Sequence, residues 1–149
     1  MLIAGSNYGC GSSREHAVWG MLQYGFKAVV ASRFGEIFYS NALNNRLLLA
    51  MVPEADVQAF MDEAAQLFGP LALEIDVQHR LVRSTHHQAS FTLSDRHQRM
   101  FLQGLDVIGT SLSYAEQINA FAAKHWAAQP RVKDVARTTR ERLSALAQR

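Results

Sequence analysis

One short loop near the N-terminus holds the residues best suited to chemistry. Residues 9–14 read GCGSSR and lie between a predicted strand at 1–4 and a helix predicted to begin at Ser12 or Ser13. Free backbone N–H groups and the helix dipole favour an anion at a helix N-terminus, and glycines let a ligand come close to the backbone. Serine hydroxyls add donors, and an arginine guanidinium binds carboxylates through two parallel hydrogen bonds. The loop therefore predicts a small anion site, although most turns of this composition are only turns.

Better-known loop motifs do not match these residues. A dinucleotide-binding fingerprint needs a third glycine where Arg14 stands, and the Gly-Lys-Ser/Thr of a phosphate-binding P-loop is missing from the sequence. A nucleophile elbow needs G-x-S-x-G, whereas Gly11 directly precedes Ser12. A serine nucleophile with His16 as its base would require unusual geometry, because His16 would share a helix face with Ser13. An anion-binding loop remains the favoured interpretation.

Apolar patterning places this loop in a chain of alternating short strands and helices. The strands are predicted at 26–31, 47–52, 71–77, 81–85 and 89–93, and the later helices at 34–44, 54–68, 94–103 and from Ser113 to about Trp126. The helix at 54–68 has one apolar stripe, made of Val57, Phe60, Met61, Ala64, Ala65 and Phe68. This alternation predicts an α/β protein.

The helix boundaries are predicted from capping residues. The N-terminal caps are expected at Ser12 with Glu15, at Ser94, and at Ser113 with Glu116, and the C-terminal caps at Gly25 and Gly104. Pro130 breaks the chain before a basic tail. The tail is expected to form an amphipathic helix with one face made of Val132, Val135, Ala136, Leu143, Leu146 and Ala147.

The composition limits the class of protein. The 149 residues are 48% hydrophobic and 19% charged, which suits about one globular domain. Cys10 is the single cysteine, so an internal disulfide and a cysteine-based metal site within this chain are excluded. No apolar run approaches a membrane span of about 18 residues, and we expect a cytoplasmic protein. Residues 131–149 carry six basic and two acidic side chains, for a net charge of +4, whereas the remainder carries −2.

Two longer segments resemble one family. Residues 7–45, beginning NYGCGSSREHA, and residues 104–121, GLDVIGTSLSYAEQINAF, are similar to the small subunits of 3-isopropylmalate dehydratase, which contain the swivelling domain of the aconitase superfamily. The resemblance implies a swivelling β/β/α domain, with a small mixed sheet layered with helices, over residues 1–126. Residues 127–149 would then form a separate, basic and possibly helical tail. Because the likeness begins almost at Met1, we expect the chain to lack the family's N-terminal segment.

The resemblance also implies roles for the loop. Ser12 would remove the proton from the substrate carbon, and Ser13 and Arg14 would bind substrate carboxylates. Gly9, Gly11, Glu15 and His16 would support the loop. In this family a separate large subunit carries a 4Fe-4S cluster, so this chain is expected to bind no metal itself and to act only with that partner. The substrate would be a small dicarboxylate, interconverted by dehydration and rehydration in leucine biosynthesis.

Simpler interpretations remain for several of these residues. Cys10 is expected to pack, Glu15 to cap its helix, and His16 to be a hydrogen-bonded structural residue, while the pair His86-His87 is expected to be solvated. The family usually has Asn-Gly-Leu-Leu-Pro where this chain has NRLLL at 45–49.

The resemblance leaves alternative functions open. They are the small subunit of a related hydro-lyase, of the homoaconitase or methylmalate/dimethylmaleate type, and a non-catalytic truncated interaction domain. Nucleic-acid binding is not favoured, because the basic tail lacks interleaved aromatic residues.

Overall fold

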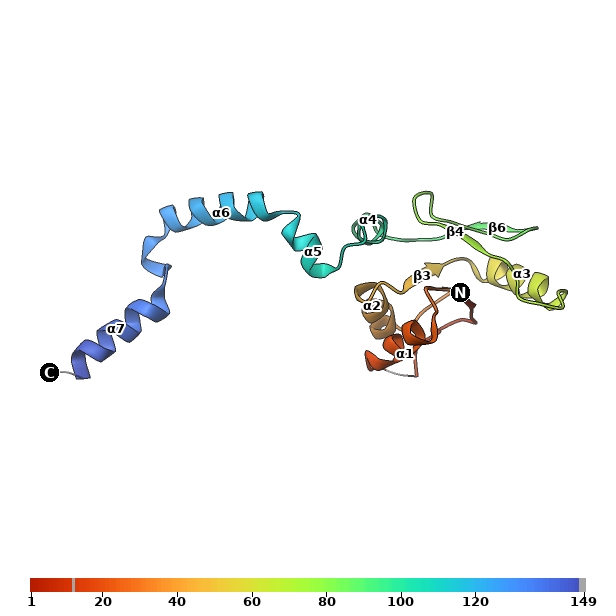
Figure 1. The fold of residues 1–149 in the computed structure, drawn as a ribbon, viewed down its shortest axis with the longest axis horizontal. Coiled ribbons are helices and arrows are strands. Elements are labelled where there is room, and N and C mark those ends of the chain that lie inside the picture. Colours follow the sequence, from red (N-terminus) through yellow and green to blue (C-terminus); the bar gives the residue numbers. More distant parts are fainter. Residues whose placement is uncertain (12, 148–149) are drawn as a thin grey trace. The chain divides into compact units, whose positions relative to one another are not determined.

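The computed structural model describes residues 1–11 and 13–147 (Figure 1). The chain divides into two compact units, Met1–Thr110 and Ser111–Arg149. This division does not test the assignment of residues 1–126 to the swivelling domain and of 127–149 to a tail, which stays a prediction. Within the described residues, no helix is both long and apolar enough to cross a membrane.

A parallel sheet forms the centre of the N-terminal unit. Its strands, in the order β1-β2-β3, are β1 (Leu2–Ile3), β2 (Ala28–Ala31) and β3 (Leu48–Met51). Parallel neighbours need a crossover connection, and here the two crossovers run through α1 (His16–Tyr24) and α2 (Glu36–Asn44). The predicted strands at 26–31 and 47–52 and the predicted helix at 34–44 are thereby confirmed.

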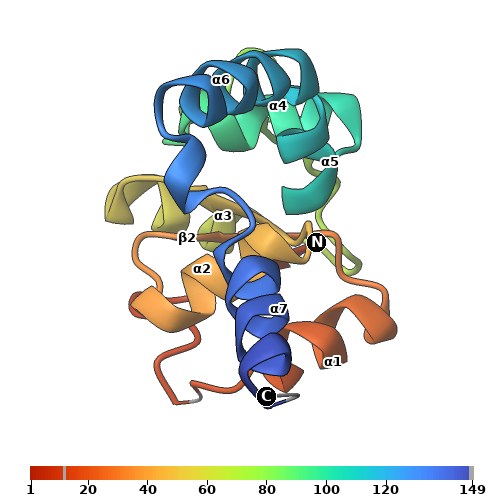
Figure 2. The same cartoon turned by 90° about the vertical axis from the view of Figure 1, so that its left-hand side faces the viewer.

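Both helices cover the same face of this sheet. Val29 of β2 pairs in register with Leu49 of β3, and both pack in one buried cluster with Val18 of α1 and Phe38 of α2. Figures 1 and 2 show α1 and α2 on one side of the parallel strands. Because side chains alternate between the faces of a strand, the intervening residues of β2 and β3 face the other side.

The second face of the sheet is covered by α3 (Glu54–Ala65) and a small antiparallel sheet. Val30 and Ala50 lie in one cluster with Phe60 of α3 and Val82. The antiparallel strands are β4 (Glu74–Asp76), β5 (Leu81–Arg83) and β6 (Gln88–Ser90), in that order. The α/β class and the helix-covered sheet are confirmed. In the structure, the expected small mixed sheet is divided into a parallel and an antiparallel sheet of three strands each. An isolated antiparallel bridge between Met51 and Thr92 joins them.

One helix of this unit follows its predicted caps closely. Helix α4 (Asp95–Gln103) begins after Ser94, whose hydroxyl accepts a hydrogen bond from the His97 backbone N–H. It ends at Gly104, which adopts a left-handed φ of 65°. Gly25 ends α1 in the same way, with φ 104°.

Other predicted boundaries are wrong. Helix α3 ends at Ala65 and not at the predicted Phe68, and both Ala65 and Phe68 of the predicted apolar stripe are exposed. Helix α6 (Ala115–Ala128) takes Tyr114, one residue after the predicted Ser113, as its N-cap, and the Tyr114 side chain makes no capping hydrogen bond. The structure also contains α5 (Val107–Leu112), which the sequence did not predict.

The C-terminal unit consists of helical segments with exposed side chains. After α6 follow the 3-10 helix η1 (Pro130–Val132) and α7 (Val135–Ala147). None of the described residues in these elements is buried. The predicted tail helix is confirmed over Val135–Ala147, but Val132 belongs to η1, because the extended conformation of Lys133 interrupts the helical path.

Candidate functional site

The N-terminal side of the loop at 9–14 is held against the segment that precedes α2. Tyr8 forms an isolated parallel bridge with Phe34. The Tyr8 N–H donates to the Arg33 carbonyl at 3.0 Å, and the Gly35 N–H donates to the Tyr8 carbonyl at 2.8 Å. The Tyr8 ring also meets the Phe38 ring edge-on, with centroids 5.5 Å apart. Backbone and side chain together therefore fix where the loop begins.

Two glycines make this close approach possible. Gly9 has a left-handed φ of 79°, and a Cβ placed there would lie 2.3 Å from Cγ of Phe38. A Cβ on Gly35 would lie 2.9 Å from Cα of Cys10. Gly11 differs, since a Cβ there would meet nothing within 4 Å. Only Gly9, of the two predicted supporting glycines, is thus required by its own conformation and packing.

The predicted reactive residues follow this anchored segment. Ser12 lies outside the described residues. Ser13 and Arg14 are exposed and lie just before Glu15, and the Arg14 carbonyl accepts a hydrogen bond from the Ala17 N–H at 3.2 Å. Ser13 borders a hollow of about 290 Å³, lined by Gly9, Cys10, Ser13, Gly35, Glu36, Ile37 and Phe38. The hollow combines apolar side chains with a serine and a carboxylate.

The start of the first helix differs from the prediction. Helix α1 begins at His16, three or four residues after the predicted start, with Glu15 in the N-cap position. The predicted capping box includes Ser12, which lies outside the described residues, and the Glu15 side chain makes no capping hydrogen bond at the N-cap position. Its carboxylate instead accepts a hydrogen bond from Nδ2 of Asn45 at 2.7 Å, while no capping hydrogen bond is found at this helix start in the described chain.

The remaining supporting residue, His16, packs against a neighbour on the same helix. Its ring lies 4.7 Å from the Trp19 ring, centroid to centroid, with an interplanar angle of 59°. The Trp19 indole N–H donates to Oδ1 of Asn45 at 3.1 Å. The structure therefore brings Glu15, His16 and Trp19 together at the start of α1, opposite the end of α2.

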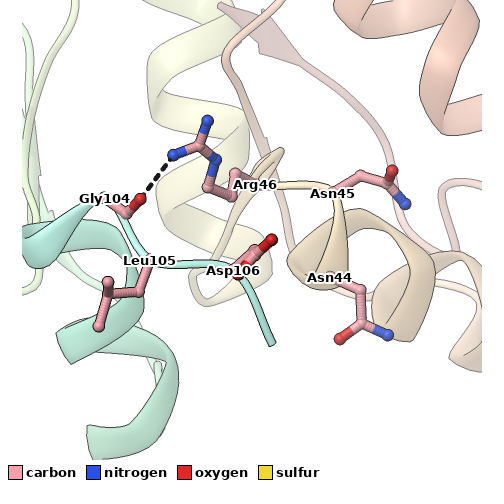
Figure 3. Close-up of a pocket in the computed structure, with 6 residues that line it drawn as sticks. All are labelled: Asn44, Asn45, Arg46, Gly104, Leu105 and Asp106. Carbon is pink, nitrogen blue, oxygen red and sulfur yellow. Dashed lines mark hydrogen bonds between the residues drawn. The ribbon is translucent and has the colours of Figure 1, made fainter. Parts of the chain in front are cut away.

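A second and larger hollow, of about 470 Å³, lies where the turn after α2 meets the end of α4 (Figure 3). It is lined by Asn44, Asn45, Arg46, Gly104, Leu105 and Asp106. Arg46 has a left-handed φ of 61°, at the position where the resembling family usually has glycine. Its guanidinium Nη1 donates to the Gly104 carbonyl at 2.8 Å, so this side chain connects the two segments.

The donor set of this chain does not fit an iron–sulfur cluster. Such clusters are held by several cysteine thiolates, whereas Cys10 is the single cysteine of the sequence. Cys10 is also exposed, so the expectation that it packs is wrong. Among the described residues, no group of three or more histidine, cysteine, aspartate or glutamate side chains could hold a metal ion.

One histidine outside the loop is less solvated than expected. His87 is half-buried, with Nε2 2.8 Å from Oδ1 of Asp56 and its ring edge-on to Phe60 at 4.9 Å. His86 is exposed, as predicted. The expectation is wrong for His87 because the turn between β5 and β6 places it against α3, which a local pattern does not reveal.

Asn45, Trp19 and Gly35 lie near the loop but were not predicted to support it. Asn45 lies 30 residues from Glu15 along the chain, and Gly35 touches Cys10 from a distance of 25 residues. A useful indication was present at Gly35, because a glycine is consistent with close approach of another backbone segment. Nothing local pointed to Asn45.

The parallel sheet is covered by helices and carries a glycine- and serine-bearing loop anchored beside α2. These features define an α/β domain with one anchored loop. The Aconitase C-terminal domain family matches residues 1–55 of this chain. The "3-isopropylmalate dehydratase small subunit 1" of Chromobacterium violaceum is 54% identical over 144 residues, covering 97% of this chain and 68% of that protein. The "3-isopropylmalate dehydratase small subunit" of Cupriavidus necator is 43% identical over 122 residues, covering 81% of this chain and 59% of that protein.

A solved structure agrees with these relatives. The crystal structure of 3-isopropylmalate dehydratase from Methanocaldococcus jannaschii matches with a TM-score of 0.57 and 27% identity, covering 81% of this chain and 66% of that one. The chain belongs to the family of 3-isopropylmalate dehydratase small subunits. It spans between 59% and 68% of the length of these three relatives.

Proposed function

We propose that this chain acts as the small subunit of 3-isopropylmalate dehydratase, a hydro-lyase that interconverts 2- and 3-isopropylmalate by removing and re-adding water in leucine biosynthesis. The observation that carries the proposal is the loop at 9–14, which has the sequence GCGSSR in a chain 54% identical to a small subunit of that name. The anchoring of this loop by Gly9 and Phe38 supports it, since a reactive loop must be held in one geometry.

The proposed chemistry assigns one role to each polar residue of the loop. Ser12 removes the proton from the substrate carbon, and Ser13 and Arg14 bind the substrate carboxylates. A serine hydroxyl is a poor base unless the alkoxide is stabilised. The positive charge of Arg14 and the positive end of the α1 dipole supply such stabilisation in a closed site. Glu15 and His16 support the loop through the end of α2 and through Trp19.

The proposal requires a second protein. Because the thiol content of this chain does not fit a cluster, we assign the 4Fe-4S cluster of this reaction to a separate large subunit. The two chains would act as a complex in the cytoplasm. The isolated chain, purified without oxygen, is expected to contain no stoichiometric iron or sulfide and to show no isomerase activity until the large subunit is added.

Replacement of Ser12 tests the proposed base. In a complex with the large subunit, Ser12→Ala should lower turnover by ~10²–10⁴, the usual scale for a positioned general base, without preventing assembly. Ser90→Ala is the matched control, because Ser90 is exposed on β6 in the antiparallel sheet. If Ser12→Ala retains turnover within about threefold of the unsubstituted complex, Ser12 is not the base.

The substrate is tested with a panel of malate homologues. The proposal expects the highest kcat/KM for isopropylmalate, and a preference for homocitrate-like or methylmalate-like diacids would replace it with a related hydro-lyase. Arg14→Lys keeps the positive charge but loses the planar fork, so it should lower kcat/KM for the preferred diacid. A fully active lysine variant would contradict carboxylate binding by Arg14.

A further inference from the structure

The side chain of Asn45 connects the end of α2 with the start of α1. Asn45 is the first residue after α2 and is half-buried. Its Nδ2 donates to Oε1 of Glu15 at 2.7 Å and to the Asn41 carbonyl at 2.9 Å. Its Oδ1 accepts from the Trp19 indole N–H at 3.1 Å. Three of the four hydrogen bonds that an asparagine side chain can make are therefore used.

The hydrogen-bond partners of Asn45 allow only one orientation of its side-chain amide. An indole N–H can only donate, so Oδ1 must face Trp19. An ionised carboxylate and a backbone carbonyl can only accept, so Nδ2 must face Glu15 and Asn41. An aspartate at this position has the same shape but would place an anionic oxygen against both acceptors.

The two ends of α2 thereby hold the two ends of the loop. At the start of α2, Gly35 binds Tyr8 on the N-terminal side of the loop. At the end of α2, Asn45 binds Glu15, the residue that directly follows Arg14. We propose that Asn45 is a positioning residue for the loop at 9–14, acting through Glu15 and Trp19. In its activity arm this inference rests on the proposed dehydratase function.

The activity arm measures kcat in the complex with the large subunit for Asn45→Asp, for its control, and for a double variant. Asn45→Asp removes both donated hydrogen bonds and should lower kcat by ~10–100-fold, the scale expected when a reactive group is misplaced by about 1 Å. Asn44→Asp is the matched control: it introduces the same charge at the preceding, exposed asparagine and should leave kcat within about twofold of the unsubstituted complex.

A compensating substitution separates positioning from a merely structural role. In the double variant Asn45→Asp with Glu15→Gln, the new amide can donate to the new carboxylate, which restores the contact with reversed polarity. The double variant should recover at least about threefold in kcat over Asn45→Asp, short of full recovery because the Asn41 carbonyl still faces an acceptor.

Amide hydrogen exchange on the complex provides an arm that does not depend on activity. The Ala17, Val18 and Trp19 N–H groups bind the carbonyls of Arg14 and Glu15 in the first turn of α1. Asn45→Asp should accelerate their exchange at least about tenfold, while Asn44→Asp should not, and exchange in β2 should be unchanged in both.

The outcomes are distinguishable. Loss of kcat in Asn45→Asp alone, partial recovery in the double variant and faster exchange in the first turn of α1 support the proposal. Activity of Asn45→Asp within about threefold, an equal loss in Asn44→Asp, or no recovery in the double variant overturns it. If the unsubstituted complex shows no isomerase activity, the proposed function fails, and the exchange arm alone decides whether Asn45 positions the loop.

Discussion

The two compact units of the chain differ in what holds them together. Every buried apolar side chain of the described residues belongs to Met1–Thr110, where two clusters fill the two faces of the parallel sheet. In α6 and α7 the large apolar side chains are exposed, Phe121 at 70% and Leu143 at 60%. Helices of 14 and 13 residues are only marginally stable in water without packing. The first unit is therefore stabilised by its own core, whereas the second gains little from burial within itself.

Replacing a phenylalanine with alanine should affect the free energy of unfolding strongly in the first unit and hardly at all in the second. Phe60→Ala removes a fully buried ring between α3 and the sheet and should lower the free energy of unfolding by ~3–5 kcal/mol. Phe121→Ala should change it by less than ~0.5 kcal/mol. Denaturant unfolding followed by circular dichroism measures both. A comparable loss in Phe121→Ala would show that the C-terminal unit has a packed core, and the two units would then not differ in how they are stabilised.

The two glycines of the loop provide the next largest difference. Gly9→Ala places a methyl group against Phe38 and requires alanine to adopt a left-handed φ. It should therefore lower the free energy of unfolding by ~2–4 kcal/mol. Gly11→Ala should cost less than ~0.5 kcal/mol, because the added methyl group meets open space. Thermal melts of both variants check this, and equal melting temperatures would contradict the anchoring of the loop by Phe38.

A helix cap in the N-terminal unit should have a smaller, measurable effect. Ser94→Ala removes the acceptor for the His97 N–H and should lower the free energy of unfolding by ~1 kcal/mol. Ser94→Asp keeps an acceptor at the N-cap and should be close to neutral. If both variants lose the same stability by urea titration, the hydroxyl is not acting as a cap.

The smallest effect is expected on α7. Leu143→Gln replaces an exposed apolar side chain with a polar one and should alter the free energy of unfolding by less than ~0.5 kcal/mol. Urea titration of the isolated chain measures this. A loss above ~1 kcal/mol would mean that α7 packs in solution and that the two units are more alike than their burial indicates.

Local patterns predicted some boundaries and missed others for identifiable reasons. The caps at Ser94, Gly104 and Gly25 were predicted correctly because capping depends on residues within one turn of the helix. Phe68 was placed in the apolar stripe of this helix because helical spacing continued past Ala65, although the helix itself ends there. Periodicity indicates which face of a helix is apolar, not how far a partner surface extends along it.

The candidate site shows the same limit. The sequence marked the loop at 9–14 through its residue types, and its resemblance to one family assigned roles to Ser12, Ser13 and Arg14, which stay predictions. It assigned Glu15 to a local capping box, whereas the structure directs that carboxylate to Asn45. Competition between a local and a distant partner is settled by which one the fold brings within hydrogen-bond distance.

By itself the sequence determined the α/β class, the order of the elements apart from α5, the glycine-ended helices and the loop that carries the reactive residue types. These follow from interactions within a few residues of one another. Only the tertiary structure decided that Phe38 excludes a side chain at Gly9, that the two ends of α2 hold the loop, and that α6 and α7 find no buried contacts in the described chain. The physical reason is that these features depend on atoms that lie far apart along the chain and meet only when the sheet and its helices have packed.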